Sequence, residues 1–344
     1  MTIQFGAKPT PQDLKCYAQS AYWDGSRFLN LEETTMDFKL RSFPQFLKKQ
    51  LFDKQGREPN VKLPILPLPV KEFLAPSHFM KYCWYGHSVV LMRLNNQTIL
   101  IDPMLGPNAA PISPLAVNRF SDNSIQLIDT FPDIDLMCLT HDHYDHIDYA
   151  SITKLKTKVK KYYVALGVKR LLLKWGIEEQ LITEFDWWET QCFQDIHIHF
   201  TPTRHFSGRG LTDRAKSLWG GWVFNTEQES IWFSGDGGYG KHFKTIGERF
   251  GSFDFAFMEC GQYNEHWHQI HMYPEESVKA AMDVNAKKIT PVHWAGFALA
   301  QHTWVEPADR FVLECEKQNV SYITPQLGEL VNTSEATKQQ PWWK

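Results

Sequence analysis

Three histidines and three aspartates stand within the eleven residues CLTHDHYDHID, from Cys138 to Asp148. His141, His143, Asp145 and His146 form an H-x-H-x-D-H pattern directly after the apolar run IDLMCLT, which predicts a strand. A loop that leaves a strand end can keep alternate residues on one side, so His141 and His143 are expected to converge while Asp145 and His146 face a second point. Imidazole nitrogen and carboxylate oxygen are ligands that Zn²⁺ accepts. The spacing therefore predicts ligands for two metal ions.

Four residues do not complete two metal sites, so further ligands are expected at the ends of other strands. His205 follows the alternating segment DIHIHFTPTR, Asp236 ends IWFSGD, and His293 ends KKITPVH. Each is a polar residue at the point where an apolar strand gives way to a loop, and such loops commonly carry function. One strand-end histidine alone would indicate a structural role, but the complete set indicates metal ligation.

The elements that must position these residues begin near residue 80. Short apolar strands are predicted in KYCWYGHSVVLMRL, TILIDP, IDLMCLTH, YYVAL, DIHIHFTPTRHF, GGWVFNTEQESIWFSGD, FDFAFMECG and KKITPVHW. Helices are predicted in YASITKLKTKVKK, GVKRLLLKWG and PEESVKAAMDVN. The strands come in two runs, each followed by helices, which indicates an α/β protein with two sheets packed together and helices outside.

The N-terminal part has a different character. We interpret residues 1–75 as an extension that wraps the core and residues 76–344 as the catalytic domain, joined by the proline-rich segment EPNVKLPILPLPVKEF. Within the extension, MDFKLRSFPQFLKKQLF has apolar residues at helical spacing with lysines on another face. Such a helix packs on the catalytic core or, as a basic amphipathic helix, touches a membrane surface.

Composition limits the class of protein. The 344 residues carry a formal net charge of −3 and no basic tail, so no nucleic-acid partner is expected. The longest apolar run, LPILPLPV, is far too short to span a bilayer, and the chain start lacks the features of a signal peptide. Six scattered cysteines without a C-x-x-C pair indicate reduced thiols. We expect a cytoplasmic protein, with peripheral contact at the inner face of a membrane and oligomerisation both left open.

The motifs carry a resemblance to a known family. H-x-H-x-D-H followed by a later His, Asp and His resembles the metallo-β-lactamase superfamily over residues 80 to about 335. WYGHSVVL, LIDPML, THDHYDHIDYASI, FDWWE, SLWGGW, FSGDGGYG, HMYPEESV and HWAGFAL are similar to the branch that contains N-acylphosphatidylethanolamine-hydrolysing phospholipase D. The resemblance implies an αββα sandwich, with two mixed sheets packed face to face and helices outside.

The resemblance also implies roles for individual residues. His141, His143 and His205 would hold the first metal ion, Asp145, His146 and His293 the second, and Asp236 would bridge them. Two Zn²⁺ ions are expected, although the same ligands accept Mn²⁺ or Fe²⁺.

The implied reaction is hydrolysis of an N-acylphosphatidylethanolamine-like phospholipid to N-acylethanolamine and phosphatidic acid by a hydroxide that the two metals hold. Asp145 and His271 are the predicted catalytic residues, with His271 contacting the phosphate or assisting the leaving group. Tyr144, Tyr149, His271 and Trp294 are predicted to contact the substrate. Asp142 would support a ligand histidine or cap its loop, Asp102 would orient a ligand or form a turn, and His87 is interpreted as a structural residue near the site.

Three alternatives remain at the sequence level. The same scaffold could act on a lactone, a cyclic nucleotide, a sugar phosphate or another small molecule, because a fold does not choose among these. An iron oxidoreductase is disfavoured because relatives of that kind have a carboxylate where this chain has His143. A non-catalytic binding protein is disfavoured by the complete ligand set.

Overall fold

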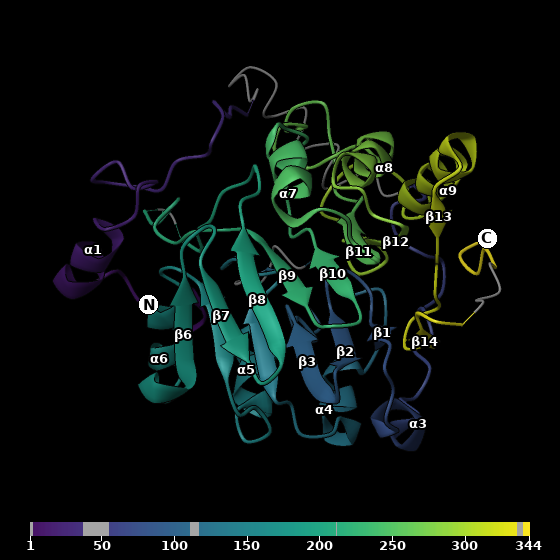
Figure 1. The fold of residues 1–344 in the computed structure, drawn as a ribbon, viewed down its shortest axis with the longest axis horizontal. Coiled ribbons are helices and arrows are strands. Elements are labelled where there is room, and N and C mark those ends of the chain that lie inside the picture. Colours follow the sequence, from purple (N-terminus) through teal and green to yellow (C-terminus); the bar gives the residue numbers. More distant parts are fainter. Residues whose placement is uncertain (1–2, 37–54, 111–116, 211, 336–339) are drawn as a thin grey trace.

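The computed structural model describes residues 3–36, 55–110, 117–210, 212–335 and 340–344. The helix predicted over residues 36–52 falls almost entirely outside these described residues. Figure 1 shows two sheets that lie against each other, with helices on their outer sides.

Among the described residues, each sheet has seven strands. The first contains, in spatial order, β14 (Leu330–Asn332), β1 (Lys81–Trp84), β2 (Val90–Leu94), β3 (Gln97–Ile101), β4 (Leu136–Leu139), β5 (Tyr162–Ala165) and β6 (Ile182–Phe185). The second contains β13 (Ser321–Tyr322), β12 (Lys288–Val292), β11 (Phe255–Glu259), β10 (Ser230–Phe233), β9 (Gly221–Asn225), β8 (Ile196–Thr201) and β7 (Thr190–Phe193). Both sheets are mixed. In the first sheet the strands β3, β4, β5 and β6 are parallel to one another, and in the second sheet β10, β11, β12 and β13 are. Every other pair of neighbouring strands is antiparallel.

The helices lie outside the two sheets. Beside the first sheet are α4 (Leu127–Thr130), α5 (Tyr149–Leu155) and α6 (Lys169–Lys174), and beside the second are α7 (His242–Phe250), α8 (Pro274–Asp283) and α9 (Glu306–Gln318) (Figure 1). The shorter elements are η1 (Ile3–Phe5), α1 (Pro11–Tyr17), α3 (Val70–Leu74), η2 (Ser124–Gln126) and η3 (Glu179–Leu181). The αββα arrangement predicted from the sequence is therefore confirmed.

Aromatic side chains fill the space between the sheets. The Tyr82 ring of β1 lies 5.3 Å from Phe255 and 5.0 Å from Phe257 of β11, measured between centroids. Phe185 of β6 meets Trp222 of β9 at 5.1 Å in an edge-to-face contact. Such contacts add to the free energy gained by burying the rings. They fix the two sheets face to face, so the loops at the strand ends meet above a rigid core.

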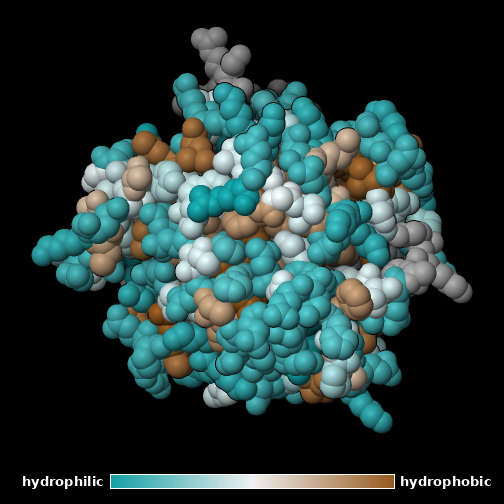
Figure 2. Space-filling model, viewed as in Figure 1, coloured by the Kyte–Doolittle hydropathy of each residue, from teal (hydrophilic) through white to brown (hydrophobic). Residues whose placement is uncertain are grey.

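The surface differs from the aromatic core in its hydropathy. The face shown in Figure 2 is mainly hydrophilic, with hydrophobic residues in small separate groups. Within the described ranges, no helix combines the length and the apolar character needed to cross a bilayer.

Candidate metal centre

The candidate site lies where strands of both sheets end. His141 follows β4, His205 follows β8, Asp236 follows β10 and His293 follows β12. All four residues of β4 are buried, so its apolar sequence places the next polar residues at the edge of the core. The loops of the two sheets converge there, which brings together residues that are far apart in the sequence.

The first group of candidate ligands consists of His141, His143 and His205. Nδ1 of His143 lies 2.9 Å from Nε2 of His141 and 3.2 Å from Nε2 of His205. The other ring nitrogen of His205, Nδ1, donates to the carbonyl of Ile270 at 3.0 Å, which leaves Nε2 unprotonated and available as a ligand. Three nitrogens at one point are a suitable set for a metal ion such as Zn²⁺.

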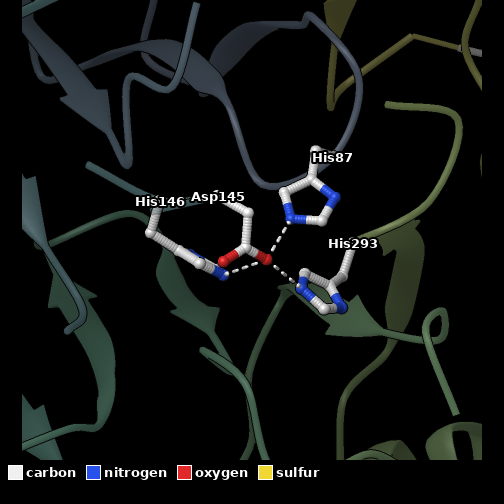
Figure 3. A group of neighbouring side chains, drawn as sticks. All are labelled: His87, Asp145, His146 and His293. Carbon is white, nitrogen blue, oxygen red and sulfur yellow. Dashed lines mark hydrogen bonds and ion pairs between the residues drawn. The ribbon is translucent and has the colours of Figure 1, made fainter. Parts of the chain in front are cut away.

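Figure 3 shows the second group, in which three imidazoles surround the carboxylate of Asp145. Oδ2 of Asp145 lies 2.8 Å from Nε2 of His87, 3.4 Å from Nε2 of His293 and 3.6 Å from Nε2 of His146. The sequence predicts His87 as a structural residue near the site, and the structure places its fully buried side chain within this group, in contact with Asp145. The structure therefore adds one histidine to the residues expected here.

Asp236 lies between the two groups. Its Oδ2 atom is 2.9 Å from Nε2 of His146 and 3.0 Å from Nε2 of His293. The same oxygen is 3.9 Å from Nε2 of His141 and 4.0 Å from Nε2 of His205. One carboxylate oxygen thus faces nitrogens of both groups, as a bridging ligand must.

Electrostatics distinguishes His293 from the three histidines of the first group. Burial, together with neighbouring imidazoles, holds the pKa of His141 and of His205 well below the usual value, and burial lowers the pKa of His143 to about 4. Burial also disfavours a charged His293, but Asp236 and Asp145 raise its pKa to about 10. The first group is therefore neutral at pH 7, the form in which imidazole binds a metal.

The two aspartates stay ionised. Burial by itself would raise the pKa of Asp236, but His146 and His293 hold it well below the usual range. The same holds for Asp145, where burial is outweighed by His146, His293 and His87. Carboxylates in this form are acceptors only and are ready to bind a cation.

Two further aspartates support the loop. Asp102 bonds Nδ1 of His146 at 2.7 Å, so it takes the orienting role that was one of its two predicted alternatives. Asp142 accepts from the backbone N–H of Gly208 at 2.7 Å and from Ser217 Oγ at 2.6 Å. Its contacts fit the loop-capping alternative.

His271 borders both groups, and it has a partner that the sequence did not indicate. Its ring lies 5.0 Å from the His205 ring and stacks on His293 at 5.1 Å, between centroids. Its Nδ1 atom makes a very short hydrogen bond with Oε1 of Glu259, the last residue of β11. Glu259 is fully buried, and burial raises its pKa, which the neighbouring His271 opposes.

The other residues predicted to contact a substrate pack against protein. The Tyr144 hydroxyl donates to the Arg209 carbonyl at 2.9 Å, and the Tyr149 ring lies 5.7 Å from that of Trp175. Trp294 is only 1% exposed, because its indole stacks on Trp84 at 5.3 Å. The structure thus places Trp294 in the core and leaves His271 as the member of this set beside the histidine groups.

A hollow of about 510 Å³ opens beside the first group. It is lined by the N-terminal segment 27–36 and by His205, Phe206, Arg214, Trp219 and Ile270. Asn30 ties this segment to the site, because its side chain donates to the His205 carbonyl at 2.8 Å and accepts from the His205 N–H at 3.0 Å.

The sequence of this chain is similar to those of several known proteins. The family model described as "Beta-lactamase superfamily domain" matches residues 97–294. An uncharacterised protein of Mycobacterium tuberculosis is 32% identical over 330 residues, covering 94% of this chain and 87% of that protein. N-acyl-phosphatidylethanolamine-hydrolyzing phospholipase D 1 of Caenorhabditis elegans is 30% identical over 291 residues, covering 79% of this chain and 81% of that protein.

Solved structures give the same fold. An isothiocyanate hydrolase from Delia radicum gut bacteria superposes with a TM-score of 0.58 at 20% identity, covering 73% of this chain and 98% of that one. The family model spans more than half of the chain, and the His/Asp groups are of the kind that holds metal ions. The chain therefore belongs to the metallo-β-lactamase superfamily of metal-dependent hydrolases.

Proposed function

We propose that this chain is a phosphodiester hydrolase that cleaves N-acylphosphatidylethanolamine-like phospholipids to N-acylethanolamine and phosphatidic acid. The observation that carries the proposal is the position of Asp236 Oδ2, within 4.0 Å of Nε2 atoms from both histidine groups. Two adjacent cation sites suit in-line displacement at phosphorus. The choice of lipid rests on the similarity to the C. elegans phospholipase D.

The residues present fit two divalent cations. His141, His143 and His205 would hold one, Asp145, His146 and His293 the other, and Asp236 would contact both. When bound, such a pair lowers the pKa of water and neutralises charge on phosphoryl oxygens. The mixed imidazole and carboxylate donors favour Zn²⁺ and also accept Mn²⁺ or Fe²⁺.

The chain's own residues have separate tasks in this proposal. The two buried aspartates stay ionised before the centre is loaded, so each offers carboxylate oxygens to a cation. His271 stands beside both histidine groups and is 13% exposed, so its free ring edge can reach a phosphoryl or leaving-group oxygen. A hydrogen bond there would favour the charge that develops as the phosphorus–oxygen bond breaks.

Product analysis by mass spectrometry tests the proposal. Zinc-loaded protein is incubated with an N-acylphosphatidylethanolamine in detergent, beside His143→Ala and the matched control His197→Ala, which alters an exposed histidine on β8. We expect N-acylethanolamine and phosphatidic acid from the wild type and from His197→Ala, but not from His143→Ala. If metal-loaded wild type leaves the lipid intact yet opens a lactone or hydrolyses a cyclic nucleotide or sugar phosphate, the lipid assignment is wrong and the hydrolase class stands.

A further inference from the structure

Glu259 is a buried carboxylate whose two oxygens have different partners. Its side chain is fully buried at the end of β11. Oε2 accepts from the backbone N–H of Gly237 at 2.9 Å, and Oε1 makes the short bond with Nδ1 of His271. Buried polar groups that keep hydrogen bonds of this kind fix the conformation of their partners.

The His271 ring is held at one edge and open at the other. Within the described chain, its Nε2 atom has no hydrogen-bond partner, whereas Nδ1 is committed to Glu259. The ring is stacked on His293 at an interplanar angle of 12°, so its plane is fixed as well. Of the two ring nitrogens, Nε2 is therefore the one that can meet a substrate.

We propose that Glu259 is a positioning residue that holds His271 in the Nδ1–H tautomer and so presents Nε2 to the substrate. In this proposal Glu259 is ionised and can only accept hydrogen bonds, so the proton of the Glu259–His271 bond lies on Nδ1. The same logic applies where a buried aspartate fixes a catalytic histidine in serine hydrolases. The kinetic consequence rests on the phosphodiester hydrolysis proposed above, but the tautomer itself does not.

Glu259→Gln is a sharp test because an amide offers only one acceptor oxygen. The Gly237 N–H must keep an acceptor in this buried position, so the amide oxygen is expected to take the place of Oε2. The amide NH₂ then faces Nδ1 of His271, which must accept instead of donate. The substitution preserves shape but forces His271 into the Nε2–H tautomer.

The first readout is nuclear magnetic resonance of ¹⁵N-histidine-labelled, zinc-loaded protein, with the His271 signals assigned by their loss in His271→Gln. We expect a protonated Nδ1 in the wild type and a protonated Nε2 in Glu259→Gln. The matched control is Glu229→Gln, because Glu229 is also a buried carboxylate that accepts from a backbone N–H. Glu229 directly precedes β10, whereas the candidate site lies beyond the other end of that strand. A protonated Nε2 in the wild type, or an unchanged tautomer in Glu259→Gln, would overturn the proposal.

The second readout is a double-mutant cycle on kcat with a phosphodiester that the wild type hydrolyses. Glu259→Gln and His271→Gln are each expected to lower kcat about 100-fold, and the double variant to fall no further than about threefold below either. Losses that multiply would mean that Glu259 does not act through His271. Because Oε1 of Glu259 is also 3.5 Å from Nδ1 of His293, metal content is measured for each variant, and a loss of metal in Glu259→Gln would overturn the assignment to His271.

The two proposals fail separately. If the wild type hydrolyses no phosphodiester, the proposed function is wrong and the tautomer measurement alone decides the role of Glu259. If the wild type is active but the losses multiply, the function stands and the positioning role is wrong.

Discussion

Oδ2 of Asp102 lies 2.7 Å from Nδ1 of His146, and both side chains are fully buried. The same carboxylate accepts from the backbone N–H of Thr140 at 2.8 Å and from its hydroxyl at 2.6 Å. Asp102 therefore fixes the ring of His146 from behind while Nε2 faces the metal centre. Partners of this kind orient metal ligands and raise their basicity.

Asp102→Asn is expected to weaken metal binding about 10- to 100-fold. Asparagine fits the backbone, because φ of Asp102 is 41°, in the left-handed region that Asn tolerates. Its amide oxygen would keep the Thr140 N–H, so its NH₂ would donate to Nδ1 of His146 and leave the ring proton on Nε2, the nitrogen that faces the metal centre. Chelator competition followed by metal analysis measures the affinity.

A matched control is Asp148→Asn. Asp148 is the N-cap of α5 and accepts from the Ser151 N–H at 2.9 Å, a role that asparagine fills equally well. The Asp148→Asn variant should bind metal with the same affinity as the wild type. Equal loss in both variants would show that Asp102 acts on the loop as a whole and not through His146.

His87 provides a second prediction at the centre. His87→Asn removes the imidazole 2.8 Å from Asp145 Oδ2 but suits the backbone, since φ is 53°. We expect metal affinity to fall about tenfold or more at the second group, while the first group keeps its ion. Metal titration resolves the two sites, with His197→Asn on the exposed face of β8 as the control. Unchanged affinity at both sites would return His87 to a structural role.

The clustering of these histidines and aspartates could be predicted from the sequence because each residue follows an apolar strand. The contact of His87 with Asp145 and the burial of Glu259 beside His271 could not be predicted, for physical reasons that differ. His87 stands within an apolar stretch, and its partner Asp145 is 58 positions away, so only the tertiary fold brings them together. Glu259 ends the run FDFAFME, where a charged residue is typical of a strand that reaches solvent. Nothing local shows that it stays fully buried beside His271.

The fold could be predicted at the level of layers, but several elements were missed. The helix α9 was not among the predictions, although Ala308, Phe311 and Cys315 are buried at helical spacing. The two C-terminal tryptophans pack on the protein itself. Trp342 and Trp343 each lie 5.5 Å from the Trp294 ring. Aromatic composition indicates burial, but it does not indicate which surface covers a ring.

The N-terminal segment offers a third prediction. Asn30 makes two hydrogen bonds to the backbone of His205 and accepts a third from Trp219 Nε1 at 3.2 Å. Asn30→Ala leaves these groups without partners and should lower the free energy of unfolding by about 1–3 kcal/mol. Urea unfolding measures the change, with the exposed Gln228→Ala as the control. A loss no greater than that of the control would mean that water replaces Asn30 at no cost.

The fourth prediction concerns acid sensitivity away from the metal centre. His242 begins α7, is 4% exposed, and has an Nε2 atom with no hydrogen-bond partner in the described chain. Burial, and to a lesser degree Arg204, lowers its pKa from 6.5 to about 3. The folded protein therefore keeps His242 neutral at pH values where the unfolded chain binds a proton.

The sign of the effect follows from this difference. Between pH 6.5 and 3 the unfolded state holds one more proton at this site, so stability falls as pH falls. Going from pH 7.5 to 5.5 should cost about 1.4 kcal/mol through His242 alone. Urea unfolding of the wild type and of His242→Leu at both pH values isolates this amount, because the contribution of the metal-site histidines is common to both proteins. The free energy of unfolding of His242→Leu should change less between the two pH values, by that amount. An equal change in the two proteins would mean that His242 is protonated, or solvated, in the folded state.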